Sequence, residues 1–272
     1  MRKNDRYLQV AIASAKEAGR IQMLHYGHSH QVEYKGDINP VTEVDRLCER
    51  AIVKMILDAF PDHDILTEES PFKGKGSSWK WIIDPIDGTT NYFHRFPCFC
   101  VSIGLEVEGE VKVGVVYIPT LNELFHAEKG KGAFLNGERI VVSQIDRLNR
   151  SLLCTGFPYD VHEHADFYLR YFRQFITKSF AIRRPGSAAI DLSYLAAGRF
   201  DGFWEFKLRA WDVAAATLMI TEAGGKVTDF QGSPFNIYSE KILASNGLIH
   251  QEMIEAIQEM NNNIGEPLPP TP

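Results

Sequence analysis

The chain has 272 residues, of which 44% are hydrophobic and 24% charged, the composition of a soluble globular protein with a large core. The formal net charge of -6 and the dispersed lysines and arginines give no electrostatic reason to bind nucleic acid. No apolar run of about 18 residues and no signal-peptide core is present, and the cysteines show neither CxxC spacing nor a dense framework, so we expect a cytoplasmic protein with reduced thiols.

The first part of the chain is predicted to be strand-rich. Hydrophobic periodicity predicts a helix over 5–26, and a second helix should begin at Thr42 after a loop over 35–40 that Gly and Pro interrupt. The expected strands cover residues 65–67, 79–83, 98–106, 111–118, 122–127 and 150–155.

The remainder alternates between helices and strands. Helices are expected near 164–177, 187–197, 211–223 and from about 249, with strands near 180–183, 201–205, 226–230 and 241–245. This change predicts an α+β half over 1–146, an α/β half over 147–260 that packs with it as one unit, and a disordered tail over 261–272.

Residues 81–91, WIIDPIDGTTN, form the most informative stretch. Asp84 and Asp87 lie on either side of a Pro at the end of an apolar strand, so one turn can direct both carboxylates into one cavity. The same turn brings the carbonyl of Ile86 alongside them. Hard oxygen ligands of this kind suit magnesium or manganese rather than zinc.

The residues that follow this acidic turn favour anion binding. Gly88 lets the backbone approach a ligand, and the amides of Gly88, Thr89 and Thr90 would begin a helix whose N-terminus binds phosphate. The alternative is a simple turn with a capped helix, because Asp, Pro, Gly and Thr all favour turns. Two further acids, Glu68 after a short strand and Asp212 at the start of an apolar helix, favour the metal site, although Asp212 alone would be explained by the helix dipole.

Three blocks stand in the same order as in a known family: residues 68–70 (EES), residues 81–91, and residues 211–225, which begin WDVAA and end EAGG. On these blocks the chain resembles the inositol monophosphatase family, and it looks most similar to the bacterial inositol-1-monophosphatase type. The resemblance extends to about residue 259. It implies a five-layered αβαβα sandwich, dependence on two or three magnesium ions that manganese can replace, inhibition by lithium, and a homodimer.

The resemblance also implies roles for the acidic residues. Glu68, Asp84 and the Ile86 carbonyl match the ligands of one metal ion, whereas Asp84, Asp87 and Asp212 match those of a second. A third, weaker ion would bind Glu68 and water. Asp45 and Thr89 match the pair beside the attacking water.

Further positions match the family's substrate contacts. Glu205 matches the acid that binds substrate hydroxyls, while Ser187 and Ala188 belong to the substrate-facing loop and Asp87 also faces the substrate. Lys35 and Arg209 are additional candidates, with a solvated surface charge as the alternative for each. The chain has Ala210 where family members have Pro, a departure that affects loop stiffness more than chemistry.

The resemblance therefore implies a magnesium-dependent phosphomonoesterase that hydrolyses myo-inositol monophosphate by direct attack of a metal-activated water, which Glu68 and the Thr89–Asp45 pair orient. No Cys or His lies within the three blocks, so we expect no phosphoenzyme. Fructose 1,6-bisphosphate, NADP or another small phosphate ester remains an alternative substrate. An alternative of another class is a transcription- or RNA-associated interaction protein with a docking surface around Arg183, Arg184 and Arg199.

Overall fold

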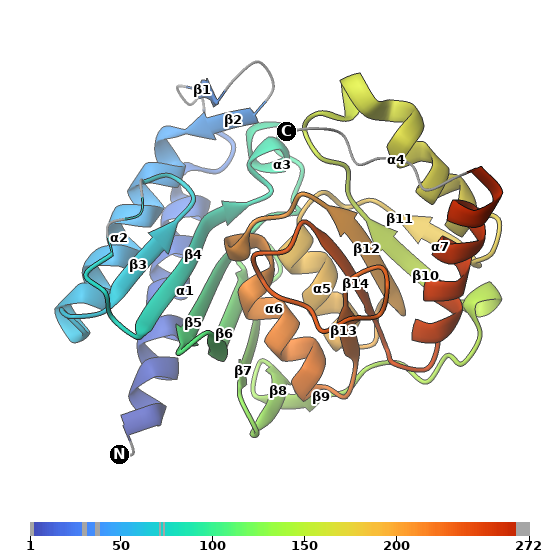
Figure 1. Ribbon diagram of the computed structural model, residues 1–272. Helices are drawn as coiled ribbons and strands as arrows, with labels where there is room; N and C mark the ends of the chain where they lie inside the picture. Colours follow the sequence, from blue (N-terminus) through green and yellow to red (C-terminus); the bar gives the residue numbers. More distant parts are fainter. Residues whose placement is uncertain (1–2, 29–31, 36–38, 71, 73, 265–272) are drawn as a thin grey trace.

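The computed structural model describes residues 3–28, 32–35, 39–70, 72 and 74–264. Two β-sheets alternate with three layers of helices (Figure 1). One helix pair covers the outer face of the larger sheet, a second pair lies between the sheets, and a third covers the outer face of the smaller sheet. The sandwich that the resemblance implied is confirmed.

Helices α1 (Lys3–His25) and α2 (Glu43–Ala59) form the first outer layer. Small residues along α1, including Ala11 and Ala15, are fully buried, as are Ile52 and Ile56 of α2, because these positions recur at helical spacing and face the sheet. Strands β1 (Val32–Lys35) and β2 (Asn39–Thr42) connect the two helices as an antiparallel pair. The loop predicted over 35–40 is thus partly strand, and its residues 36–38 lie outside the described chain.

The larger sheet has seven strands in sequential order, and only its first pair is parallel. The strands are β3 (Asp64–Thr67), β4 (Trp79–Asp87), β5 (Cys100–Val107), β6 (Glu110–Ile118), β7 (Glu123–Glu128), β8 (Gly132–Leu135) and β9 (Glu138–Ile140). The last two strands were not predicted, since both are short and follow Gly-containing turns.

Strand β4 extends beyond its predicted end, through Pro85 to Asp87. The pairing with β5 is interrupted by a bulge between Asp84 and Asp87, where a proline can be accommodated without loss of a ladder hydrogen bond. Gln22 of α1 fixes the bulge, because its Nε2 donates to the Pro85 carbonyl at 2.8 Å. Helix α3 (Thr89–Phe93) follows directly.

Helices α5 (Ala188–Ala196) and α6 (Ala210–Glu222) lie between the sheets and are apolar on most of their surface, as expected for helices buried on two sides. Gly114 of β6 allows α6 to approach closely, since a Cβ there would lie 2.4 Å from the carbonyl oxygen of Ala215.

The smaller sheet has the strand order β11-β10-β12-β14-β13. Its strands are β10 (Leu152–Thr155), β11 (Ala181–Arg183), β12 (Gly202–Phe206), β13 (Lys226–Thr228) and β14 (Lys241–Ser245), and a short 3-10 helix, Leu148–Arg150, precedes them. Strand β10 is parallel to both neighbours, so the segments after β10, β11 and β12 leave the same edge of the sheet.

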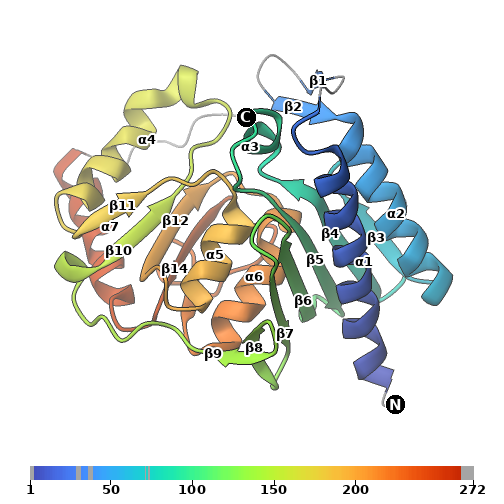
Figure 2. The same cartoon turned by 180° about the vertical axis from the view of Figure 1, so that it is seen from behind.

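Helices α4 (Val161–Ile176) and α7 (His250–Ile264) cover the outer face of the smaller sheet (Figure 2). Helix α7 includes residues 261–264, which the sequence had assigned to the tail, and residues 265–272 lie outside the described chain. Among the described helices, none combines the length and the apolar character that crossing a membrane requires.

Candidate metal and phosphate site

A cavity of about 760 Å³ opens where the two sheets meet. It is lined by the segments that follow strands β3, β4, β10, β11 and β12, and by the first turns of α3, α5 and α6. Residues from sequence positions 68 to 212 therefore face one space, and the site belongs to the packed pair of sheets rather than to either sheet alone.

Three carboxylates converge inside this cavity. One oxygen each from Asp84, Asp87 and Asp212 lies within 4.8 Å of the other two. Asp84 and Asp87 are buried at the bulge of β4, and Asp212 lies half-buried in the first turn of α6. Glu68 lines the same cavity from the segment after β3.

The close approach of these acids opposes their ionisation. Burial raises the pKa of Asp84 well above its usual range, and the negative charges of Glu68, Asp87 and Asp212 raise it further. Burial likewise raises the pKa of Asp212, with a contribution from Asp87, and it raises that of Asp87 to about 6. A bound divalent cation would remove this repulsion, and the oxygen donors present fit a hard cation such as Mg²⁺.

Hydrogen bonds hold each carboxylate in place. Oδ2 of Asp87 accepts from the hydroxyl of Ser187 at 2.7 Å and from the Ala189 amide at 2.6 Å. The backbone amide of Ile86 donates to Asp84 at 3.0 Å, and that of Arg209 donates to Asp212 at 2.6 Å. The remaining carboxylate oxygens are oriented before any ligand binds.

Thr89 and Asp45, which the resemblance pairs, form a hydrogen bond. The hydroxyl of Thr89 can donate a hydrogen bond to Oδ1 of Asp45, 3.1 Å from Oγ1, or to the carbonyl oxygen of Ile86, 2.9 Å from Oγ1. Asp45 is fully buried on α2. The pair therefore joins the outer helix layer to the rim of the acidic cluster.

The turn for which phosphate binding was predicted has a glycine-dependent backbone. Gly88 has a φ of 97°, in the left-handed region that favours glycine, and a Cβ there would lie 2.8 Å from the Cys98 carbonyl oxygen. Gly88, Thr89 and Thr90 all line the cavity. Asn91 ties this turn to the loop before α5, since its Nδ2 donates to the carbonyls of Cys98 at 2.7 Å and Pro185 at 2.9 Å.

Glu49 is a supporting residue that the sequence analysis missed. It is buried on α2 and accepts hydrogen bonds from the Glu69 amide at 3.1 Å and from the hydroxyl of Ser70, so it fixes the segment that carries Glu68. The available signal was its spacing: Asp45 and Glu49 are four residues apart on one helix and face the same side.

The other wall of the cavity carries Glu205, Ser187 and Ala188, the positions expected to contact substrate. Burial raises the pKa of Glu205 to about 8, and the charge of Asp87 adds to this effect. Gly156 leaves room for the Glu205 carboxylate, since a Cβ at 156 would lie 2.2 Å from its Oε1. Asp191, a second acid on this wall, was not singled out from the sequence, although a carboxylate in an otherwise apolar helix was a usable signal.

The two additional candidates differ in how far they can be placed. Arg209 lines the mouth of the cavity and its side chain is exposed. Lys35 ends β1, and its side chain lies outside the part of the chain that is described. Lys207, which also lines the mouth, forms an ion pair with Asp160 at 2.7 Å.

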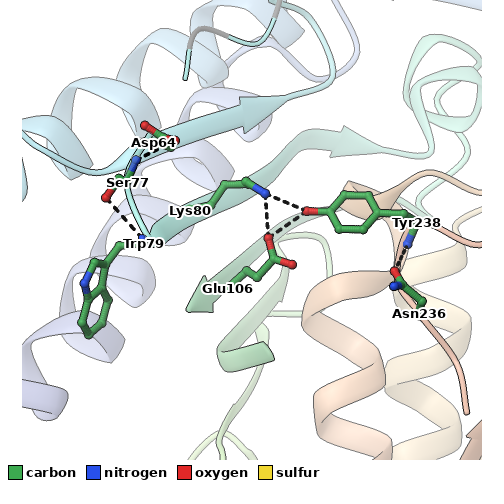
Figure 3. A network of polar contacts seen from close by, with 7 residues as sticks. All are labelled: Asp64, Ser77, Trp79, Lys80, Glu106, Asn236 and Tyr238. Atoms are coloured by element: carbon green, nitrogen blue, oxygen red, sulfur yellow. Dashed lines mark hydrogen bonds and ion pairs between the residues drawn. The ribbon is translucent and has the colours of Figure 1, made fainter. Parts of the chain in front are cut away.

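A polar network joins Lys80 of β4 and Glu106 of β5 to Tyr238, which lies in the segment between β13 and β14 (Figure 3). Nζ of Lys80 and the hydroxyl of Tyr238 both donate to Oε2 of Glu106, at 2.9 and 2.8 Å. The neighbouring Ile237 packs against a buried cluster of Ile82, Ala210 and Ala214, of which the two alanines lie at the start of α6. The network thus links the larger sheet to the helix end that carries Asp212.

Comparison with known proteins agrees with this architecture. A model described as the inositol monophosphatase family matches residues 3–262. The fructose-1,6-bisphosphatase/inositol-1-monophosphatase of Thermotoga maritima is 42% identical over 259 residues, covering 95% of this chain and 98% of that protein. Nus factor SuhB of Escherichia coli K12 is 40% identical over 255 residues, covering 93% and 96%. The crystal structure of extragenic suppressor protein SuhB from Bartonella henselae superposes with a TM-score of 0.88 at 41% identity, covering 92% of this chain and 98% of that one. The chain belongs to the inositol monophosphatase family.

Proposed function

We propose that this protein is a Mg²⁺-dependent phosphomonoesterase that hydrolyses a myo-inositol monophosphate to inositol and phosphate. The supporting observation is the convergence of Asp84, Asp87 and Asp212 beside the glycine turn at residue 88, which brings a cation-binding cluster and backbone amides to one cavity. The negative charge of a phosphate ester repels the hydroxide that forms as the attacking water loses its proton, so both features serve the same reaction.

Glu68, Asp84, Asp87, Asp212 and the Ile86 carbonyl would hold the metal ions. When bound, Mg²⁺ neutralises the phosphate charge, lowers the pKa of water and stabilises the departing alkoxide. The amides of Gly88, Thr89 and Thr90 would bind the phosphate oxygens, because the first amides of a helix lack partners within it.

The chain's own residues would orient the attacking water. Glu68 and Oγ1 of Thr89 face the cavity from different elements and can each accept a hydrogen bond from a water. As Oγ1 of Thr89 takes a proton from this water, its own proton can pass to Oδ1 of Asp45, 3.1 Å away. We infer direct in-line attack, so a phosphoaspartate trapped on Asp84 during turnover would contradict this mechanism.

The position of Glu205 favours a substrate with a polyhydroxylated leaving group. It is buried in the wall beside Ser187 and Ala188, where its carboxyl can bind substrate hydroxyls. A sugar bisphosphate is the second candidate, because the cationic Arg184, Lys207 and Arg209 line the same cavity and could bind a second phosphate. The name of the Thermotoga relative includes both activities.

A docking role in transcription, which the name of the Escherichia coli relative suggests, has weaker support. Arg183 and Arg184 are exposed, but Arg199 forms a bidentate ion pair with Glu123, with nitrogen–oxygen distances of 2.6 and 2.8 Å. The basic surface considered from the sequence is therefore partly neutralised.

The test is phosphate release from inositol 1-phosphate, glycerol 2-phosphate, fructose 1,6-bisphosphate and NADP, each with Mg²⁺ and with added Li⁺. We expect the highest kcat/KM for inositol 1-phosphate, inhibition by Li⁺, and a loss of about 100-fold or more in Asp84→Asn. Near-normal turnover by that variant would contradict the metal assignment. A docking function would survive the Asp84→Asn substitution. Separately, we expect size-exclusion chromatography to show that the protein is a homodimer.

A further inference from the structure

Asp191 differs from Asp84 and Asp87 because its Oδ1 has no hydrogen-bond donor among the described residues. The residue is 1% exposed, and its Oδ1 is buried without a partner among the described residues. By contrast, Asp87 and Asp84 each accept a backbone amide. A buried carboxyl without a partner lowers stability, so its presence beside a cavity indicates that a ligand supplies the partner.

The position of Asp191 suggests what kind of ligand this is. It lies one turn into α5, after Ser187 and Ala188, and it lines the cavity together with Glu205 of β12. Burial raises the pKa of Asp191 well above its usual range, and the charge of Glu205 raises it further. Arg184 is near enough to lower both pKa values, but it forms no ion pair with either acid in the described chain.

A protonated carboxyl group can both donate and accept hydrogen bonds, and the two acids that line this part of the cavity, Asp191 and Glu205, both have raised pKa values. Such a pair of carboxyl groups complements neighbouring hydroxyl groups on a sugar or cyclitol, because each hydroxyl group is also both a donor and an acceptor. An aromatic or simple alkyl leaving group has no hydroxyl groups that could form these hydrogen bonds.

We propose that Asp191 is a substrate-recognition residue which, together with Glu205, binds neighbouring hydroxyl groups of a polyol leaving group. This inference rests on the proposed phosphatase function and extends it by assigning the residue that selects polyols over other phosphate esters.

The test compares two variants on two esters. Asp191→Ala removes the carboxyl, whereas Asp191→Asn keeps a donor and an acceptor in the same place. For inositol 1-phosphate we expect Asp191→Ala to raise KM about 10- to 100-fold and Asp191→Asn to change it less than about 3-fold. For p-nitrophenyl phosphate, whose leaving group has no free hydroxyl, kcat/KM should change less than about 3-fold in both variants.

Two controls separate recognition from structural damage. Ser193→Ala alters the same helix at a buried hydroxyl that contacts Sδ of Met219, and it should leave the KM of both esters unchanged. The melting temperature of Asp191→Ala should equal or exceed that of the wild type, because a buried unpartnered carboxyl is removed. The Mg²⁺ concentration for half-maximal activity should also be unchanged.

Three results for Asp191→Ala would overturn the inference. They are an equal loss of kcat/KM on both esters, an unchanged KM for inositol 1-phosphate, or a change in the Mg²⁺ concentration for half-maximal activity. Its failure can be told from that of the proposed function. A wild type that hydrolyses neither ester contradicts the phosphatase function, while calorimetric binding of inositol 1-phosphate still tests Asp191. Equal affinity of the wild type and Asp191→Ala in that measurement would exclude the recognition role.

Discussion

The hydroxyl of Ser187 donates a hydrogen bond to the carboxylate of Asp87 at 2.7 Å, joining residues 100 positions apart in the chain. Asp87 ends a strand of the larger sheet, and Ser187 begins a helix between the sheets. The geometry of the acidic cluster therefore depends on how the two sheets pack.

Removing that hydroxyl should weaken metal binding. In Ser187→Ala, Asp87 keeps the Ala189 amide but loses one of the contacts that orient it. Loss of such a supporting contact commonly costs 10- to 100-fold in metal affinity or activity, so we expect the Mg²⁺ concentration for half-maximal activity to rise about 10-fold. A Mg²⁺ titration of phosphate release measures this. Ser193→Ala on the same helix serves as the control, and an unchanged titration in Ser187→Ala would refute the coupling.

Metal binding should stabilise the folded protein, because a cation relieves repulsion among Asp84, Asp87 and Asp212. At about 100 times the dissociation constant, Mg²⁺ should add about 2.7 kcal/mol to the free energy of unfolding. For a chain of this size that corresponds to about 5 to 10 °C in melting temperature. The shift should disappear on chelation and be much smaller in Asp84→Asn. An equal Mg²⁺-induced rise in melting temperature in the wild type and in Asp84→Asn would show that the ion binds elsewhere.

The network of Lys80, Glu106 and Tyr238 should contribute measurably to stability (Figure 3). Tyr238→Phe removes one neutral donor and should cost about 1 kcal/mol in the free energy of unfolding. Lys80→Met should cost more, about 1 to 3 kcal/mol, because the buried Glu106 loses its counter-charge. Urea denaturation measures both values. Lys54→Met is the matched control, since its ion pair with Asp58 is exposed and should be worth under about 0.5 kcal/mol. A Lys80→Met cost no larger than this control would contradict the expected contribution.

His250 should make stability depend on pH. Its ring nitrogens lie 2.9 Å from the hydroxyls of Thr228 and Ser245, and burial, together with the charge of Lys226, lowers its pKa to about 4. The folded state therefore keeps His250 neutral over a range in which the unfolded chain, with a pKa of about 6.5, takes up a proton. Stability from this group is fully present above pH 6.5 and is lost as the pH falls toward 4, by up to about 3 kcal/mol.

The comparison of wild type with His250→Gln isolates this effect, because both proteins share all other titrating groups. Urea denaturation at about pH 7.5 and pH 4.5 should show that the stability difference between them shrinks at the lower pH. A difference that stays constant would show that His250 is not the responsible group.

The sequence by itself determined most of the helices and strands in their order, and the two carboxylates of the acidic turn. Helical periodicity in residues 5–26 predicted α1, and the apolar run before Asp84 predicted β4, because burial of one face imposes these periods on local sequence. The motif over residues 81–91 identified two carboxylates and a glycine turn. These features depend on residues close together in the chain, so local pattern was sufficient.

Only the tertiary structure decided which distant residues meet. Local pattern could single out Glu49 and Asp191 as acids of interest, but it could not show which residues they would meet. The partner of Glu49 after β3, the contact of Gln22 with Pro85, and the lack of a partner for Oδ1 of Asp191 among the described residues all depend on the packed fold. The short strands β8 and β9 were missed for the same reason, because their stability comes from pairing across the sheet rather than from their own few residues. The burial that raises the pKa of Glu205 is also a property of the packed sheets, since a carboxyl in the extended chain remains in water.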